Sequence, residues 1–302
     1  MNADLAPDAA AARNADHERL IRRLMTAARR TARGSDPEAI HDTRVAVRRA
    51  EAALDLYRDA LAPRRRRRAR RALAGLRDAL GAARECQVSA ALLTERLPAL
   101  GATEHAAAAE LVRRLTRRRR RLERDAARSC RRRVIARTAR RLRRAFASLP
   151  SLEGEAWLDS ARARAAARLE RARSALAQPF EGAGDEGMHR ARIAVKRARY
   201  ALELLNVVEP VRDSGPLEEL KALQERLGAI HDLAMVHERV TRRARKIASA
   251  GAELAGGLRD LAARLEAEAA DFGRKLKVML ARSTRIRTLG VIDSGARPSR
   301  TA

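Results

Sequence analysis

One stretch of this chain occurs twice, and this repeat is the strongest constraint on its fold. Residues 41–54 read HDTRVAVRRAEAAL and residues 189–202 read HRARIAVKRARYAL, with eight of fourteen positions identical at an offset of 148. A second pair, LGAAREC at 80–86 and LGAIHDL at 227–233, recurs at an offset of 147. Segments that recur in the same order at nearly one offset indicate a duplicated unit. We therefore expect a fold with two similar halves.

The residue types and their spacing predict helices along nearly the whole chain. Ala, Leu, Arg and Glu dominate, β-branched residues are sparse, and apolar residues recur at steps of three and four. The predicted helices cover residues 15–33, 37–61, 64–82, 85–97, 103–148, 155–178, 186–208, 216–229, 231–250 and 253–281. The stretch 103–148 is long enough for two helices. The pairs Leu80-Gly81 and Leu227-Gly228 resemble helix ends with glycine caps.

Repeat and helix pattern together predict an all-α fold of two pseudo-symmetric four-helix bundles. The first bundle would occupy residues 10–150 and the second residues 151–282, with a linker near 149–155. Residues 283–302 have no apolar period and are predicted to form a disordered basic tail.

The charge of the chain indicates a polyanionic partner. Sixty-six lysines and arginines face 38 aspartates and glutamates, which gives a formal net charge of +28. An apolar fraction of 46% is enough for packed cores, so this is not a disordered basic segment. Only six aromatic residues occur, which argues against binding of single-stranded nucleic acid by base stacking. Nonspecific binding of DNA or RNA at low salt stays an alternative.

Several classes of protein and site lack support in the sequence. Cys86 and Cys130 cannot build a disulfide scaffold and form no Cys-x-x-Cys pair. The N-terminus has no secretory signal pattern, and no stretch approaches the roughly 18 apolar residues of a membrane span. We find no metal-ligand cluster and no glycine-rich phosphate loop. We expect a cytoplasmic protein without cofactor or metal that is not an enzyme; a phosphohydrolase or phosphotransferase using the repeated histidines is the less favoured alternative.

The first repeated segment places cations along one side of a helix. His41, Arg44 and Arg48 lie at i, i+3 and i+7 and share a face, and Arg49 lies at its flank. The opposite side carries an apolar stripe that we predict to be buried: Ile40, Val47, Ala50, Leu54 and Tyr57. A face from residue 41 to residue 52 is roughly 17 Å long. That length suits an extended chain of phosphates better than one small anion.

The second copy repeats this arrangement. His189, Arg192 and Lys196 line one face, and Arg199 and Tyr200 extend it. The stripe predicted to pack inward is Met188, Val195, Ala198, Leu202 and Leu205. An isolated basic helix face is usually only solvated, but its recurrence at matched positions favours a binding site. His17, His105 and His237 lack this context and are expected to be packing or surface residues, and the consecutive arginines in 64–68, 117–121 and 131–133 are expected to be largely solvated.

These segments resemble the signature segments of CHAD domains, a family of histidine-bearing α-helical domains. The matching stretches read IHDTRVAVRRAEAALDLY, MHRARIAVKRARYALELL and LKALQERLGAIHDLAMV, and the resemblance covers about residues 10–282. It implies two four-helix bundles related by a pseudo-twofold axis, with a basic cavity or groove between them that binds inorganic polyphosphate. Some members associate with polyphosphate granules. Many carry an N-terminal triphosphate-tunnel domain, of which nothing precedes residue 15, so the resemblance is to the stand-alone form.

The resemblance also implies a set of polyphosphate-binding residues. Carried over position by position, they are His41, Arg44, Arg48, Arg49, Arg84, His189, Arg192, Lys196, Arg197, Arg199, Tyr200 and Lys221. The first half departs from the second at three of these positions: Glu51 aligns with Arg199, Ala52 with Tyr200, and Ala74 with Lys221. We therefore expect the first half to contribute fewer contacts.

Overall fold

A computed structural model describes residues 6–34, 36, 38–147, 149, 156–178, 180, 186–210, 214–248 and 252–282. Its helices are α1 (Ala6–Arg33), α2 (Ala39–Leu56), α3 (Pro63–Arg96), α4 (Ala102–Ser129), α5 (Arg132–Phe146), α6 (Ala156–Ala177), α7 (Glu186–Val208), α8 (Gly215–Ile247) and α9 (Ala252–Arg282). A short 3-10 helix, η1 (Leu97–Ala99), follows α3. The described residues contain no strand, which confirms the all-α prediction. The predicted tail at 283–302 lies outside the described residues.

Two of the predicted helix ends, in α3 and in α8, are wrong. Each helix runs without a break through the Leu-Gly pair that resembled a cap, so Gly81 and Gly228 lie inside helices of 34 and 33 residues. Both leucines are fully buried, and apolar packing continues on either side of each glycine. An interior glycine costs a helix only about 0.5–1 kcal/mol relative to alanine, which this packing offsets. The stretch 103–148, by contrast, divides into α4 and α5.

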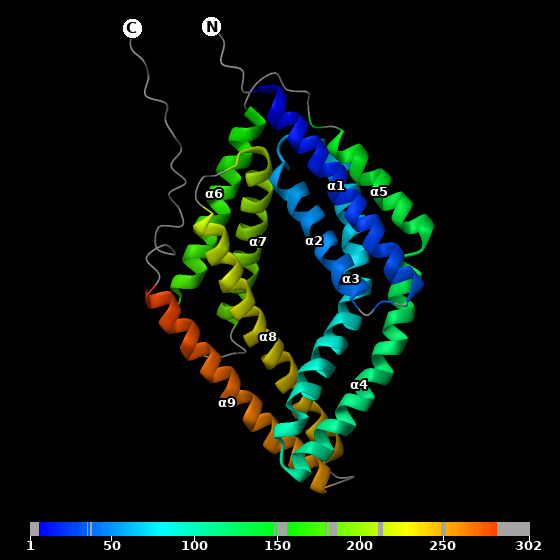
Figure 1. Ribbon diagram of the computed structural model, residues 1–302, viewed down its shortest axis with the longest axis vertical. Coiled ribbons are helices and arrows are strands. Elements are labelled where there is room, and N and C mark those ends of the chain that lie inside the picture. The colour runs from blue at the N-terminus through cyan, green and yellow to red at the C-terminus, as the bar shows by residue number, and fades with distance from the viewer. Residues whose placement is uncertain are drawn as a thin grey trace.

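The buried residues form three hydrophobic cores rather than one core for each half. One core joins α1, α2, α5 and the start of α3 to the start of α6 and the end of α7. A second core joins the ends of α3 and α8 to α4 and the start of α9. A third core is formed by residues of α6, α7, α8 and α9. Figure 1 shows the resulting open, four-sided outline, with α4 and α9 converging at the bottom. Since two cores draw on both halves, the prediction of two separate bundles is not confirmed.

The helix order nonetheless follows the sequence repeat. The repeated segments form α2 and α7, each is followed by a long helix, and α5 has no counterpart in the second half. Arg77 on α3 donates to Glu51 on α2 at 2.7 Å, and Arg199 on α7 donates to Gln224 on α8 at 2.9 Å. By the repeat offsets, Glu51 corresponds to Arg199 and Arg77 to Gln224. Matched positions are thus in contact in both halves, with donor and acceptor exchanged between the two helices, while the duplication itself stays a prediction.

Gly257 allows α9 to approach α4 closely. A Cβ at this position would lie 2.5 Å from the carbonyl oxygen of Thr103 and 3.2 Å from Cβ of Ala107. The obstacle is backbone, which cannot move aside as the end of a flexible side chain can. A larger residue would therefore push apart the two helices that hold the second core together.

We expect Gly257→Ala to destabilise the fold by about 2 kcal/mol, because the added methyl group has no room. Urea denaturation followed by circular dichroism measures this change. Gly273→Ala on the same helix is the matched control, because a Cβ there meets nothing within 4 Å. The control should stabilise by about 0.5–1 kcal/mol. Equal effects of the two substitutions would contradict the close approach.

His17 lies in a buried aromatic cluster between α1 and α5. Its ring stacks on Phe146 at a centroid distance of 3.9 Å and meets Tyr57 edge-on at 5.2 Å. Burial lowers the pKa of His17 from 6.5 to about 3, and the nearby charge of Arg13 adds to this shift. His17 is therefore a neutral packing residue, as predicted.

Acid should destabilise the protein through His17. As pH falls from 6.5 towards 3, the unfolded chain takes up a proton at His17 that the folded chain refuses, so stability falls. We expect roughly 2–3 kcal/mol of this loss by about pH 4. In urea titrations at both pH values, His17→Phe should remove that part of the loss while keeping the ring stack. The exposed His105→Phe should leave it unchanged; an undiminished loss in His17→Phe would exclude His17 as the cause.

Candidate functional site

The apolar stripes of α2 and α7 point into the cores, as predicted. The buried members are Ile40, Val47, Ala50, Leu54 and Tyr57 on α2, and Met188, Val195, Ala198 and Leu205 on α7, with Leu202 partly buried. The two helices also contact each other. Since each helix has its apolar side in a core, the cationic faces are turned away from the cores and brought near one another.

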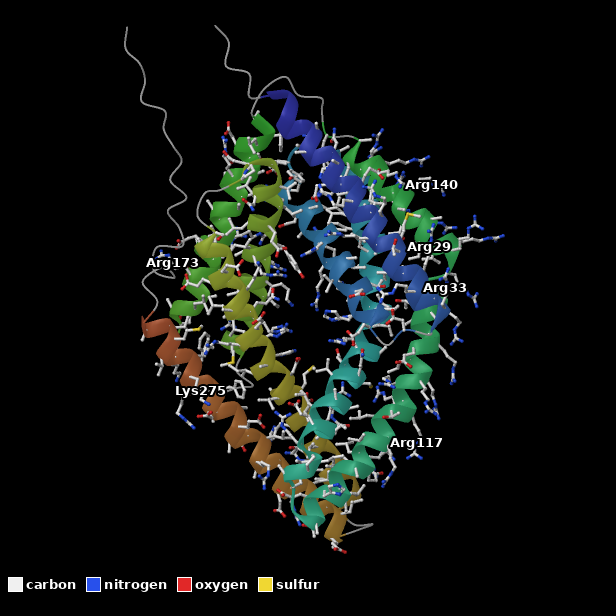
Figure 2. The ribbon with its side chains drawn as sticks, in the orientation of Figure 1. Arg29, Arg33, Arg117, Arg140, Arg173 and Lys275 are labelled. Atoms are coloured by element: carbon white, nitrogen blue, oxygen red, sulfur yellow. The ribbon has the colours of Figure 1, made fainter. Side chains whose placement is uncertain are left out.

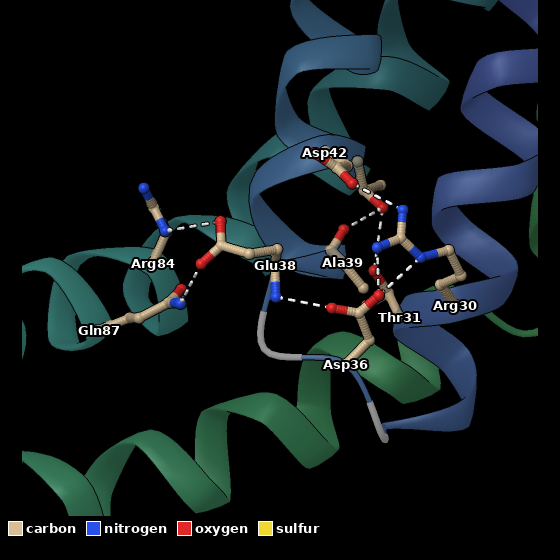
Figure 3. A network of polar contacts seen from close by, with 9 residues as sticks. Arg30, Thr31, Asp36, Glu38, Ala39, Asp42, Arg84 and Gln87 are labelled. Carbon is tan, nitrogen blue, oxygen red and sulfur yellow. Dashed lines mark hydrogen bonds and ion pairs between the residues drawn. The ribbon is translucent and has the colours of Figure 1, made fainter.

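A polar network holds the start of α2, and with it the first cationic face (Figure 3). Arg30 on α1 donates to Asp42 at 2.7 Å and also pairs with Asp36. The hydroxyl groups of Thr31 and Thr43 lie 2.9 Å apart, and the backbone N–H of Glu38 donates to Asp36 at 2.9 Å. These contacts fix the corner between α1 and α2.

Glu38 links the same corner to α3. Its carboxylate lies 3.9 Å from the guanidinium of Arg84 and accepts a hydrogen bond from Gln87 at 3.4 Å. Burial lowers the pKa of the nearby His41, and the charge of Arg84 contributes. Arg84 and His41 therefore lie close enough to act on one ligand.

Lys196 on α7 shows that the two cationic faces meet. Burial lowers the pKa of Lys196 from 10.5 to about 7, and the largest charge contribution comes from Arg48 on α2. Arg192 on its own helix and Arg44 on α2 act in the same direction. In the described part of the chain, no carboxylate forms an ion pair with Lys196, although its charge acts on the carboxyl group of Asp232 on α8. Arg199 acts in the same direction as the other arginines, so this half-buried amine lies near four guanidinium groups, an environment that favours an anionic neighbour.

Arg44 and Arg192, two of the arginines near Lys196, also have few contacts that compensate their charge. Burial lowers the pKa of Arg44 to about 10, with a further contribution from Arg48. Arg44 donates to the backbone carbonyl of Arg77 at 3.4 Å, and its guanidinium lies 3.5 Å from where a Cβ of Gly81 would be. The buried Nε of Arg192 has no hydrogen-bond partner. Ligand oxygens would satisfy these groups.

His231 and Asp232 on α8 belong to this site but were not predicted as binding residues. Burial lowers the pKa of His231 to about 4, with Arg192 and His189 contributing. The rings of His231 and His189 are 5.6 Å apart. The second repeated segment carried the signal, since its offset places His231 where the first half has Arg84. Burial raises the pKa of Asp232, opposed by the surrounding cations.

We call the following residues the central cation cluster: His41, Arg44, Arg48, Arg84, Arg192, Lys196 and His231. The exposed His189 lies at its edge. Next to it, α7, α8 and α9 enclose a cavity of about 940 Å³ whose wall includes His189, Arg192 and His231. The cavity wall also carries Met188, Met235 and Lys277 together with three glutamates, so it combines apolar, cationic and acidic side chains.

The structure does not bring every predicted residue into this cluster. Arg49 and Arg199 both pair with Glu203, at 3.4 and 2.5 Å, so the one carboxylate compensates part of their combined charge. Tyr200 is buried, with the guanidinium of Arg199 over its ring at 4.5 Å.

Two further predicted residues lie away from the cluster. Lys221 pairs with Glu218 one turn earlier on α8, at 2.7 Å. Arg197 is exposed and lines a separate hollow of about 300 Å³ with Arg168 and Arg171 of α6. It lies away from the α2 face because a step of one residue turns a helix by about 100°.

Metal and membrane sites find no support in the residues described. No group of three or more His, Cys, Asp or Glu side chains in those ranges could hold a metal ion. None of the helices described is long and apolar enough to span a membrane. Cys86 and Cys130 are buried free thiols.

Comparison with known proteins identifies the family. The family model for the CHAD domain matches residues 15–241. The chain belongs to the CHAD domain family. The crystal structure of the CHAD domain from the plant Ricinus communis is similar, with a TM-score of 0.70, 24% identity and coverage of 93% of each chain. PptA from Streptomyces chartreusis has a TM-score of 0.65 at 20% identity, over 88% of this chain and 99% of that one. No curated protein sequence matches this chain.

The convergence of the two faces predicts a coupling between Arg48 and Lys196. Replacing Arg48 with Met should raise the pKa of Lys196 by about one unit, because one neighbouring like charge is removed. Nuclear magnetic resonance of ¹³C-methylated lysines measures this pKa. Arg226→Met, which removes an exposed arginine from α8, should leave it unchanged. An unaltered Lys196 titration in Arg48→Met would contradict the meeting of α2 and α7 faces.

Proposed function

We propose that this CHAD domain protein binds inorganic polyphosphate at the central cation cluster and is not itself an enzyme. The observation that carries the proposal is Lys196, whose charge is opposed by arginines from both halves of the chain. A site so rich in cations favours a ligand with many negative charges. The family resemblance favours polyphosphate, and association with polyphosphate granules is part of the same proposal.

The residue types suit a chain of phosphates. Arg44, Arg48 and Arg192 can each pair a planar fork with two oxygens of one phosphate, whereas Lys196 acts as a point charge. Because the cluster draws on α2, α3, α7 and α8, a linear ligand can contact several helices at once. Each contact replaces a condensed counterion on the ligand, so affinity should fall as salt rises.

Binding should be coupled to proton uptake. In the free protein, burial lowers the pKa of Lys196 to about 7, so at about pH 8 the Lys196 amine is neutral in most molecules. A bound polyanion favours the charged amine and raises this pKa, and the same holds for the lowered pKa of His41. Affinity should therefore strengthen as pH falls from about 8 to about 6.

The main test removes the cluster. A triple variant, His41→Ala, Arg48→Ala and Lys196→Ala, should weaken polyphosphate binding by at least about 100-fold, since three charge-assisted contacts are lost. Isothermal titration calorimetry measures the affinity, and circular dichroism checks the helicity. The matched control is Arg64→Ala, Arg67→Ala and Arg68→Ala, which removes three exposed arginines at the start of α3. Equal losses in both variants would mean that net charge alone attracts the ligand.

The proton coupling has its own test. Calorimetry at about pH 8 in buffers of different ionisation heat should give net proton uptake on binding. Lys196→Arg keeps the positive charge but does not titrate in this range, so the uptake should decrease while binding persists. Zero uptake in the parent protein would contradict protonation at the site. Phosphate release above background with Mg²⁺ would contradict a role in binding alone.

A further inference from the structure

A second concentration of positive charge lies on α4 and α5, outside the central cation cluster. Residues 111–147 contain seventeen arginines and two acidic residues. One row of exposed arginines on α4 consists of Arg113, Arg117, Arg120, Arg124 and Arg128, and Arg114, Arg118 and Arg121 of the same helix are exposed beside it. A row on α5 consists of Arg133, Arg137, Arg140 and Arg144, and Arg132 and Arg143 are exposed beside it. We call these two rows, with Arg29 and Arg33 at the end of α1, the outer arginine face.

The spacing makes each row continuous. Successive arginines are three or four residues apart, so they lie along one side of each helix. The α4 row is about 22 Å long and the α5 row about 17 Å. Figure 2 shows Arg29, Arg33, Arg117 and Arg140 pointing outward along one edge of the molecule. Because α1 contacts both α4 and α5, the rows form a single broad surface.

Few carboxylates compensate this surface. Within the described ranges, Arg128 pairs with Asp125 of the same helix, and beside the rows Arg119 pairs with Glu123 and Arg143 with Glu18 of α1. No ion pair with an acidic residue is found there for the other arginines of the face. Arginines that need only solvation could be scattered, but these are aligned over three adjacent helices. An aligned and uncompensated set of guanidinium groups favours a long ligand that carries phosphate.

The width and chemistry of the face narrow the class of ligand. A membrane-binding face would carry apolar side chains for insertion, whereas the one large apolar side chain exposed there, among the described residues, is Val134. A single chain of phosphates is narrow and can follow one row at a time. A duplex is wide and rigid, and its phosphates can contact adjacent rows together. The α4 row alone, at about 22 Å, spans roughly two thirds of one turn of B-form DNA, which is about 34 Å.

We infer that the outer arginine face binds the phosphate backbone of double-stranded DNA without reading its sequence. The central cation cluster lies on α2, α3, α7 and α8, and the outer arginine face lies on α1, α4 and α5. The two sites share no residue, so a polyphosphate chain and a DNA duplex can be held at the same time. The inference goes beyond the proposed function and does not depend on it.

The test measures binding of a fluorescently labelled duplex of about 20 base pairs by anisotropy over a range of salt concentrations. The variant is Arg113→Gln, Arg117→Gln, Arg120→Gln and Arg124→Gln, because glutamine keeps the helix propensity. At about 100 mM salt we expect the Kd for DNA to rise at least about tenfold. The slope of log affinity against log salt should decrease by about two or more, since each lost phosphate contact contributes about 0.9.

A matched control removes the same charge from residues outside the outer arginine face. It is Arg226→Gln, Arg245→Gln, Lys246→Gln and Arg259→Gln, four exposed cations on α8 and α9. This variant should change the Kd for DNA less than about twofold. Should the α4 variant lose helicity, Arg133→Gln, Arg137→Gln, Arg140→Gln and Arg144→Gln on α5 tests the same face.

Polyphosphate binding of the same proteins separates this inference from the proposed function. Both quadruple variants should retain it, and DNA should still bind protein that is saturated with short-chain polyphosphate. Equal loss of DNA binding in the α4 variant and the control would overturn the inference, because net charge would then be the cause. So would loss of DNA binding in Arg48→Ala with Lys196→Ala, which would place the duplex at the central cation cluster.

Discussion

The structure depends on a balance between two opposing effects. Burial of the apolar stripes of α2 and α7 stabilises the fold, whereas repulsion between their cationic faces destabilises it. The inward side chains of α2 and α7, such as Val47 and Val195, are fully buried. Their burial stabilises the fold by roughly 1.5–3 kcal/mol for each large side chain. Because the apolar side of each helix faces a core, Arg48 and Lys196, on the cationic sides of α2 and α7, are brought near each other. The repulsion appears in the pKa of Lys196, which burial and Arg48 lower to about 7. A polyanion would relieve this repulsion, so the fold maintains a site in a state that favours binding.

Ion pairs with carboxylates distinguish the cations around this site. Arg49 and Arg199 share the one carboxylate of Glu203, Lys221 pairs with Glu218, and Arg84 within the cluster lies 3.9 Å from Glu38. Lys196 has no such partner in the described part of the chain. The same criterion separates the outer arginine face from ordinary solvated arginines, because its rows are aligned and scarcely paired. In a protein of net charge +28, the positions of the acidic residues therefore decide which cations have an ion-pair partner.

The long helices α3 and α8 give the site its rigidity. Each passes from one hydrophobic core to another, so the halves cannot separate as two bundles could. They also carry Arg84 and His231, at equivalent places in the second repeated segment, towards the cations of α2 and α7. Because Gly81 has no side chain, the guanidinium of Arg44 can lie against α3 at this position.

The sequence alone determined the helical class, the buried stripes of α2 and α7 and the membership of the family, because helical periodicity and a repeated segment are local patterns. It also predicted His41, Arg44, Arg48, Arg84, Arg192 and Lys196 as members of one binding set, through the family resemblance. It did not determine that α3 and α8 are continuous, because a Leu-Gly pair is compatible with a cap or an interior position until packing on both sides is known. Only the tertiary structure decided which cations meet and which are neutralised. That depends on contacts between helices far apart in the chain, such as Arg49 with Glu203, and no local spacing encodes them.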